Sequence, residues 1–435
     1  MASSIIRFLL VLIVSVSFSN AQLPTHPGIV FDLERDSSTL QYLVKINQGT
    51  PQREVKLVVD FGGKLPWFAC HGGYYSSSLR KVSCTSSQCS QAEKPVSTCA
   101  DPKICSISLR NPVTRSVGKG ELISDIVTVK SDPDNQQTPV PSSRNVAFGC
   151  AATSNILSGL DKASKGVAGL GRSSALSLAS QFAVGFQYPN IFAVDLHDSV
   201  RDEKVLETTG KIYFGGGPYI HYFWGISDLA DRVLTYTPLL INPKSEEEYF
   251  VDVKSIKVHG ETLPINNKLL SINKTTGIGG TKIDIRIPYT TLETSIYNAF
   301  IKAHTEWVDR LNIANAELMD FPNITMVAAV APFTTCYDSS TIILRGPSVV
   351  NNVAPSVSFV FPTSVWNISF FDLVIAKEGV ACVGFVDGGL NPMTSIVIGA
   401  RQIGFLEFDI SRSRLGSDKA VHKFSEQADY DAEND

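Results

Sequence analysis

The sequence predicts a mainly β protein built from two related halves, and two observations carry this prediction. Short β-branched runs, such as YLVKI at residues 42–46, recur along the chain between turns rich in glycine and proline. An apolar run that ends in an acid occurs twice, at Asp60 and at Asp284. Each acid is followed at a similar distance by an apolar segment with a glycine, at Gly169 and at Gly399. Such an internal repeat indicates two halves of the same design.

The amino end has the features of a secretory signal peptide. Arg7 precedes the apolar run FLLVLIVSVSF, and the small residues Ser19, Asn20 and Ala21 end the segment. This run is too short to span a bilayer, and no later run is long enough to be a membrane helix. We therefore expect residues 1–21 to be removed and the rest to be exported as a protein large enough for two domains.

Composition favours a soluble globular protein and argues against nucleic-acid binding. Apolar residues make up 43% of the chain, charged residues only 18%, and the formal net charge is −4 with scattered basic residues. Helical spacing of apolar residues is clear only at residues 174–186 and 291–307. The carboxy-terminal tail, residues 419–435, is acidic and poor in apolar residues toward its end, and we expect it to be disordered.

Cysteines and sequons indicate an oxidised, glycosylated protein. An even number of cysteines in an exported chain predicts disulfides, with the segment between residues 70 and 105 as a stapled surface excursion. A metal site is disfavoured because no Cys-x-x-Cys pair and no histidine cluster occurs. The eight cysteines are Cys70, Cys84, Cys89, Cys99, Cys105, Cys150, Cys336 and Cys382. Asn-x-Ser/Thr sequons predict surface glycans at Asn273, Asn323 and Asn367.

The two acids are the candidate catalytic residues. An acid at the end of an apolar strand is costly to bury unless it is paired or hydrogen-bonded. Asp60 could simply be a turn residue before Gly62 and Gly63. Together with its counterpart Asp284 it could instead be catalytic. Two carboxylates that share one proton can activate a water molecule to attack a peptide carbonyl. No histidine set suggests another kind of catalysis, and no cofactor motif is present.

Eight stretches together give the chain a family resemblance. They are VVDFGGKLPWFAC, SVGKGELISDIVTV, GVAGLGR, GKIYFGGGPY, EYFVDVKSIKVHG, GGTKIDIRIPYT and the closing SIVIGARQ with FLEFDISRSRLG. From about Leu40 to Gly416 the chain resembles the pepsin-like aspartic proteases, and more closely their plant secreted branch of dermal glycoproteins, basic seed globulins and endoxylanase inhibitors. The resemblance implies a bilobal β fold with a central cleft and a monomer, with lobes that we place at residues 22–195 and 196–418.

The active-site motif of the resembled proteases is only partly present. That motif is Asp, then Thr or Ser, then Gly in each lobe, and its hydroxyls hold the two loops together. Here Phe61 and Ile285 have no hydroxyl, and Arg286 replaces the second glycine. We expect Arg286 to keep Asp284 ionised and to work against proton sharing. The flap tyrosine is also missing, and Asn111 falls near its position.

These departures favour a binding protein over an enzyme. We expect a non-proteolytic protein of the apoplast or cell wall that holds a peptide or a protein such as a microbial glycoside hydrolase. The alternatives are an aspartic endopeptidase that uses Asp60 and Asp284, and a storage or structural glycoprotein. The two acids should meet in one cleft, joined by a hydrogen bond or a bridging water. We further expect Cys336 to pair with Cys382 and Cys70 with Cys150, and the remaining cysteines to pair within the first lobe.

Overall fold

The structure is a computed structural model, and it describes most of the chain between residues 28 and 417. The described residues are 28–70, 73–92, 103–129, 142–196, 210–217, 219, 234–318, 323–342, 344–345, 349–350, 356–368 and 373–417. The expected signal peptide, the acidic tail and Cys99 lie outside these ranges. The expected boundary between the lobes at residues 195 and 196 stays a prediction.

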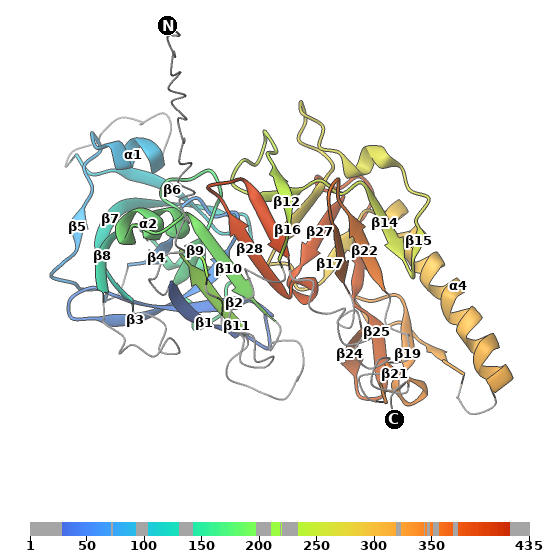
Figure 1. The fold of residues 1–435 in the computed structure, drawn as a ribbon. Helices are drawn as coiled ribbons and strands as arrows, with labels where there is room; N and C mark the ends of the chain where they lie inside the picture. Colours follow the sequence, from blue (N-terminus) through green and yellow to red (C-terminus); the bar gives the residue numbers. More distant parts are fainter. Residues whose placement is uncertain are drawn as a thin grey trace, which may run out of the picture.

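The protein is mainly β and consists of two lobes that lie side by side in Figure 1. The amino-terminal lobe contains α1 (Ser87–Ala92) and α2 (Leu178–Phe186). Its strands are β1 (Ile29–Arg35), β2 (Tyr42–Gln48), β3 (Arg53–Asp60), β4 (Trp67–Ala69), β5 (Arg80–Lys81), β6 (Ser106–Arg110), β7 (Val117–Val129), β8 (Ser142–Ala151), β9 (Gly166–Gly169), β10 (Ile191–Asp195) and β11 (Gly210–Phe214).

The carboxy-terminal lobe contains the long helix α4 (Thr294–Leu318) and the remaining strands. These are β12 (Thr235–Leu240), β13 (Tyr249–Val251), β14 (Ser255–Val258), β15 (Glu261–Thr262), β16 (Thr281–Asp284), β17 (Thr290–Leu292), β18 (Met326–Val327), β19 (Cys336–Asp338), β20 (Leu344–Arg345), β21 (Val349–Val350), β22 (Val357–Val360), β23 (Val365–Ile368), β24 (Leu373–Lys377), β25 (Val380–Val383), β26 (Phe385–Asp387), β27 (Ile396–Gly399), β28 (Phe405–Asp409) and β29 (Arg414–Ser417).

A shared sheet joins the lobes. Strand β10 pairs on one edge with β11 and on the other with β28, and β28 pairs in turn with β29. Phe192 lies opposite Phe408 in this register, and both side chains are fully buried. Because alternate residues of a strand face the same side, these rings lie on the face of the sheet that is packed into the core. The shared sheet therefore forms the floor beneath both acid loops.

The internal repeat predicted from the sequence is present in the strand pairing. Strand β3 runs parallel to β9, with Asp60 opposite Gly169. Strand β16 runs parallel to β27, with Asp284 opposite Gly399. A Cβ at Gly169 would lie 2.5 Å from the carbonyl oxygen of Leu65, so only glycine allows the chains to approach so closely. Each acid thus ends a strand that a glycine-bearing strand holds in place.

Both predicted helices are present, but their starts differ from the expected ones. Helix α2 begins at Leu178 rather than residue 174, because the Ser177 hydroxyl caps it by accepting from the amide of Ser180. Helix α4 begins at Thr294 because residues 290–292 form β17. The carboxylate of Glu293 accepts from the Ser295 and Ile296 amides and so caps its first turn.

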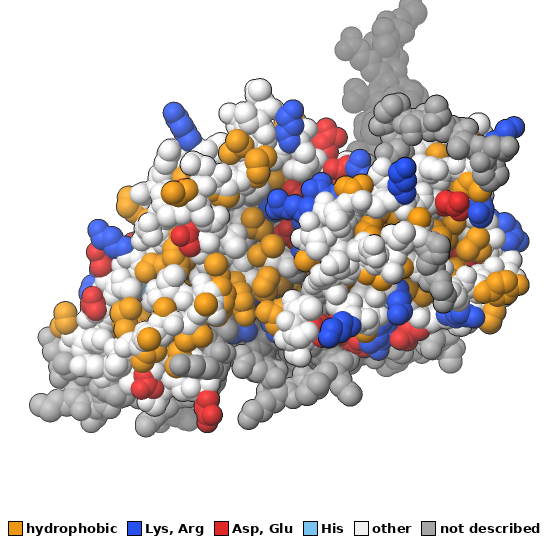
Figure 2. Space-filling view, turned by 180° about the vertical axis from the view of Figure 1, so that it is seen from behind, with side chains coloured by type: hydrophobic (Ala, Val, Ile, Leu, Met, Phe, Trp, Pro, Cys, Tyr) orange, Lys and Arg blue, Asp and Glu red, His pale blue; other side chains and the backbone are white. Residues whose placement is uncertain are grey.

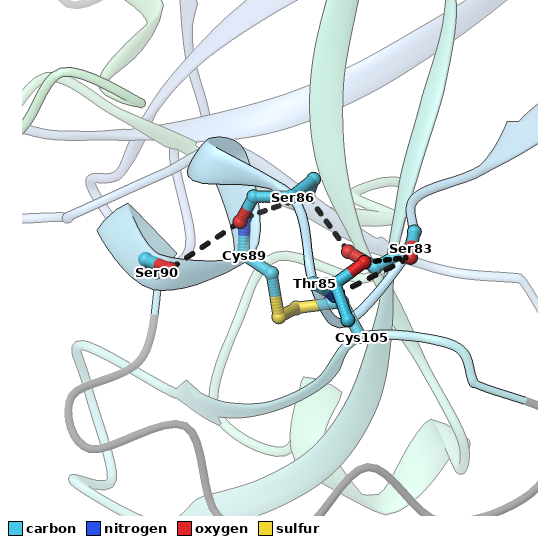
Figure 3. The surroundings of a disulfide bond; sticks show 6 residues. All are labelled: Ser83, Thr85, Ser86, Cys89, Ser90 and Cys105. Atoms are coloured by element: carbon cyan, nitrogen blue, oxygen red, sulfur yellow. Dashed lines mark hydrogen bonds between the residues drawn. A yellow bond between two sulfur atoms is a disulfide. The ribbon is translucent and has the colours of Figure 1, made fainter.

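The described disulfides include the two expected pairs. Cys70 is bonded to Cys150, and Cys336 is bonded to Cys382. A third bond joins Cys89 in α1 to Cys105, and Figure 3 shows the serine-rich turn that surrounds it. Cys84 is also disulfide-bonded.

One expectation for the cysteine-rich segment is wrong. The segment was expected to be a surface excursion, yet Cys84, Cys89 and Cys105 are buried. They pack with Trp67 and Leu109 in a second hydrophobic cluster of the amino-terminal lobe. Cysteine is a small apolar residue once it is bonded, so a stapled segment can contribute to a core as well as to a surface.

Candidate functional site

Asp60 and Asp284 occupy equivalent turns and are both buried, with 5% and 3% of their surface exposed. In the first turn the Gly62 amide donates to Asp60 Oδ1 at 2.9 Å. In the second the Arg286 amide donates to Asp284 Oδ1 at 3.1 Å. In both turns, therefore, the backbone amide two residues after the acid donates to its carboxylate and orients it. The internal repeat thus includes the side chains of the two acids.

The Arg286 guanidinium bridges the two acids. Its Nε lies 2.7 Å from Asp284 Oδ1 and its Nη2 lies 2.6 Å from Asp284 Oδ2, which makes a two-pronged ion pair. The same Nε lies 3.3 Å from Asp60 Oδ1. The acids meet in one place as expected, but the group that links them is this side chain. Bidentate arginine–carboxylate pairs are among the strongest hydrogen-bonded contacts in proteins.

Two further charged residues complete a partly buried network that the sequence interpretation missed. Lys282 Nζ lies 2.7 Å from Glu248 Oε1 and 3.4 Å from Asp284 Oδ2. Glu248 Oε1 also lies 3.6 Å from Arg286 Nη2. Three carboxylates therefore surround two cations. Figure 2 shows blue Lys and Arg side chains with red acidic ones beside them where the two lobes meet.

This environment shifts the pKa values of the two acids in opposite directions. Burial raises the pKa of Asp60, with the Asp284 and Glu248 charges adding to the effect, and Arg286 offsets it only in part. Burial also opposes ionisation of Asp284, but Arg286 and Lys282 outweigh it and hold the pKa of Asp284 below its usual value. Arg286 therefore keeps Asp284 ionised, as expected. Because the two shifts run in opposite directions, Asp60 holds a proton more readily than Asp284 does.

The positions that lack hydroxyls belong to the hydrophobic core. Phe61 is 1% exposed, and its ring centroid lies 5.7 Å from that of Phe192, 5.0 Å from that of Phe408 and 6.3 Å from that of Tyr249. Ile285 is equally buried in the same cluster. Aromatic rings from both lobes thus pack beneath the acids, where the protease motif would place hydrogen-bonding hydroxyls.

Two polar contacts reinforce the junction of the lobes beside this aromatic cluster. The Tyr249 hydroxyl donates to the carbonyl oxygen of Leu170 at 2.7 Å. The Arg172 guanidinium donates to the carbonyl oxygen of Leu240 at 2.6 Å. Packing and these bonds together hold the two acid loops in register.

The flap is the hairpin of β6 and β7, and its turn is fastened at two points. The Asn111 amide nitrogen donates to the carbonyl oxygens of Ile156 and Ser158 at 2.6 and 2.9 Å, and its oxygen accepts from the backbone amides of residues 113 and 114. On the cleft side, Arg286 Nη1 donates to the carbonyl oxygen of Pro112 at 3.4 Å. Asn111 therefore builds the turn, whereas the proteases would carry a tyrosine in this segment.

The geometry supports ion pairing at the cleft rather than activation of water. A water between the acids would need hydrogen bonds to both carboxylates, and Arg286 Nε occupies that position. Among the described residues no group of His, Cys, Asp and Glu could hold a metal ion. Within the same part of the chain, no helix combines the length and the apolar character needed to cross a membrane.

The three sequons differ in their surroundings. Asn273 and Asn323 are exposed, and the Asn273 side-chain oxygen accepts from the amides of Thr275 and Thr276. Asn367 is half-buried on β23, where its side-chain oxygen accepts from the Ser358 hydroxyl at 2.6 Å. The first two side chains are therefore open to a bulky group, and the third is less so.

Two family models match consecutive parts of the chain. The model described as xylanase inhibitor N-terminal matches residues 42–216, and the one described as xylanase inhibitor C-terminal matches residues 248–418. Each model covers one of the two acid loops together with its glycine-bearing strand.

Several plant proteins are similar to the chain over nearly its whole length. A probable aspartic proteinase, GIP2 of Nicotiana benthamiana, is 39% identical over 91% of this chain and 89% of its own length. Gamma conglutin 1 of Prunus dulcis is 33% identical over 94% and 90%, and basic 7S globulin of Glycine max is 30% identical over 97% and 96%.

Solved structures agree in fold. The crystal structure of edgp superposes with a TM-score of 0.76 at 35% identity, covering 90% of this chain and 94% of that one. The aspartic proteinase of Irpex lacteus superposes with a TM-score of 0.56 over 91% and 99%, at 15% identity, which shows the pepsin-like fold alone.

Proposed function

Because the chain belongs to the xylanase-inhibitor-like family of plant aspartic-protease-like proteins, we propose that it is a secreted binding protein rather than a protease. It acts as a monomer in the apoplast or cell wall. It binds a protein or peptide, with a microbial glycoside hydrolase as the foremost partner. We place the lobes at residues 22–195 and 196–418, except that β11 (Gly210–Phe214) pairs with β1 and β10 of the first lobe.

The observation that carries this proposal is the position of Arg286 between the acids. Its Nε contacts Asp284 Oδ1 and Asp60 Oδ1 at 2.7 and 3.3 Å, so an arginine nitrogen lies between carboxylate oxygens that a reacting water would have to touch. A general base must lie within hydrogen-bond reach of the proton it removes. The Arg286 side chain is only 17% exposed and is bound by buried carboxylates, so moving it aside would leave uncompensated charges.

Digestion of a peptide library tests the absence of proteolysis. We expect no peptide cleavage that pepstatin inhibits, at any pH from acid to neutral. The matched variants are the single reversion Phe61→Thr and the triple reversion Phe61→Thr, Ile285→Ser and Arg286→Gly. We expect the single variant to stay inactive, because Arg286 is still in place. The triple variant is assayed only under conditions in which circular dichroism shows it folded, and there it should gain weak activity.

The second candidate function is an aspartic endopeptidase that uses Asp60 and Asp284. The observation that favours it is the opposite direction of the two pKa shifts, which gives the pair a one-proton state. Pepstatin-sensitive cleavage by the unmodified protein, abolished both by Asp60→Asn and by Asp284→Asn, would establish this function and overturn the binding proposal.

The partner class is tested by enzyme inhibition. Secreted microbial endoxylanases and other glycoside hydrolases are assayed for release of reducing sugar with and without the protein. Inhibition that Asp60→Asn leaves unchanged supports a binding surface separate from the acids. If the protein inhibits no enzyme of such a panel, the proposal that its partner is a glycoside hydrolase is wrong.

We also propose N-glycans at Asn273 and Asn323, whose side chains are exposed, and little or none at Asn367. Bulky glycans require a surface asparagine, and the Asn367 side chain is engaged by Ser358. Glycopeptide mapping of the exported protein checks each site separately, and a fully glycosylated Asn367 would contradict the ranking.

A further inference from the structure

The tip of the flap presents an unusual set of side chains to solvent. Arg110 ends β6, Lys119 lies near the start of β7, Arg115 lies in the turn between them, and all three are exposed. Val113 and Val117 lie among them with 44% and 68% of their surface exposed. Arg110 pairs with Val117 across the hairpin, so the cations and the valines alternate within one small area.

The sequence of this tip, residues 110–119, contains three cations and no acid. Within the described part of the chain, none of the three cations lies in an ion pair, although the protein as a whole has a formal net charge of −4. The one acid nearby on the hairpin, Glu121, is engaged by Lys81 at 3.1 Å. Unpaired exposed cations attract acidic partners over about a Debye length, roughly 8–10 Å at physiological salt.

The tip is also held in one conformation. Asn111 joins its turn to the 3-10 helix at Ser154–Leu157, and Arg286 holds the Pro112 carbonyl from below. A surface segment that is ordered before binding loses less conformational entropy when a partner docks. The same arginine that fills the space between the acids therefore also fixes the flap.

We propose that the tip of the β6–β7 hairpin is a docking element for an acidic protein surface. Acidic charge complements the three cations, and the two valines require an apolar contact that a purely polar acidic polysaccharide does not supply. Arginine together with exposed apolar side chains is typical of protein interfaces. This inference rests on the proposed binding function and names the chemistry of the partner.

Binding of three defined probes tests the proposal. The first is a peptide of glutamates with interspersed leucines, and the second is a glutamate peptide of the same length. The third is an oligogalacturonate with the same number of carboxylates. Dissociation constants are measured on the full exported protein at low and at physiological salt. We expect the leucine-containing peptide to bind tightest, and its binding to weaken as salt rises.

Matched variants locate the binding. Arg110→Ala, Arg115→Ala and Lys119→Ala together should weaken peptide binding by about tenfold or more. The control removes the same charge from exposed lysines of the other lobe, as Lys257→Ala, Lys268→Ala and Lys274→Ala, and should change binding less than about twofold. Val113→Ser with Val117→Ser should weaken only the leucine-containing peptide.

Every other result overturns the proposal. These results are no binding, equal losses in the flap and control variants, or tighter binding of the oligogalacturonate, which would indicate a cell-wall polysaccharide instead. Mass spectrometry of the recovered peptides separates this proposal from the proposed function. Intact peptides with no flap-dependent binding refute the docking element alone, whereas cleaved peptides refute the non-proteolytic function alone.

Discussion

The loop that carries Asp60 and the loop that carries Asp284 have the same backbone frame but differ in the partners of their acids. In both, the acid ends a strand that pairs in parallel with a glycine-bearing strand. Asp284 is gripped by two nitrogens of Arg286 and lies near Lys282. Asp60 receives one amide bond and a single, longer contact to the same arginine.

This difference shows that a duplicated frame can keep its geometry while its chemistry diverges. The strands, glycines and amide bonds to the carboxylates are retained in both loops. One residue in the second loop, Arg286, makes the pair unequal by neutralising Asp284 more than Asp60. A site with an acid in each loop is therefore not by itself evidence of a catalytic dyad.

Removal of Arg286 should have the largest effect on stability. Arg286→Ala leaves Asp60, Asp284 and Glu248 with Lys282 as their one remaining cation in the network. Breaking a buried ion pair in this way costs about 3–5 kcal/mol of unfolding free energy, measured by urea denaturation at neutral pH. Arg310→Ala is the control, because its pair with Glu261 is exposed and is worth at most about 1 kcal/mol. Similar losses in both variants would contradict a central role for Arg286.

Replacement of the aromatic residue of the first loop should have the next largest effect on stability. Phe61→Thr leaves a cavity among Phe192, Phe408 and Tyr249 and places a hydroxyl there, at a cost of about 3–4 kcal/mol. Ile285→Thr, the equivalent change in the second loop, removes less volume and should cost about 2 kcal/mol. Equal costs in thermal or urea unfolding would mean that the loops contribute alike to the core.

The two acids themselves should respond in opposite ways. Asp284→Asn removes the partner of a bidentate pair and should cost about 2–3 kcal/mol at neutral pH. Asp60→Asn should be neutral or stabilise by up to about 1 kcal/mol, because it removes a buried charge whose pKa is raised. Urea denaturation of both variants at neutral pH checks the contrast.

The pH dependence of these two variants has a defined sign. The lowered pKa of Asp284 stabilises the wild-type protein above the usual aspartate value near 3.8, and this contribution is lost as pH falls below it. The raised pKa of Asp60 acts the other way, since the wild type loses stability relative to Asp60→Asn as pH rises above that value. For each variant, the difference in unfolding free energy from the wild type should therefore approach zero at acidic pH. Parallel curves would contradict the assigned directions.

The smallest destabilisation concerns the contact between the lobes. Tyr249→Phe removes the hydroxyl that donates to the Leu170 carbonyl and should cost about 1–2 kcal/mol, because the carbonyl is left without this partner in a buried site. Tyr75→Phe, at an exposed position, is the control and should change the unfolding free energy by less than about 0.5 kcal/mol.

Much of the fold could be predicted because the pattern is local and repeated. The acid at the end of an apolar strand and the glycine that follows it identify the paired strands without any knowledge of contacts. The start of α2 could have been placed better, since Ser177 is an ordinary helix cap. Glutamate is not among the usual cap residues, so Glu293 gave no such signal for α4. The burial of Cys89 and Cys105 could not, because burial depends on which strands lie above the segment.

The site was predictable in its composition and not in its geometry. The sequence identifies Arg286 as a cation near an acid. It does not show that the guanidinium lies between the two acids, because a long side chain has many rotamers. Lys282 and Glu248 come together only through the pairing of β13 with β16, which sets Tyr249 opposite Ile283. The lowered pKa of Asp284 was predictable from Arg286 two residues later, whereas the raised pKa of Asp60 comes mainly from burial, which the sequence does not show.

The sheet shared by the lobes has a consequence for the synthesis of the chain. One edge of β10 is covered by β28, which begins 405 − 195 = 210 residues after β10 ends and is therefore synthesised much later. Until then that edge and the Phe192 ring remain uncovered, and open strand edges pair readily with other chains. The amino-terminal lobe produced alone should therefore aggregate, because its β10 edge has no β28 to cover it.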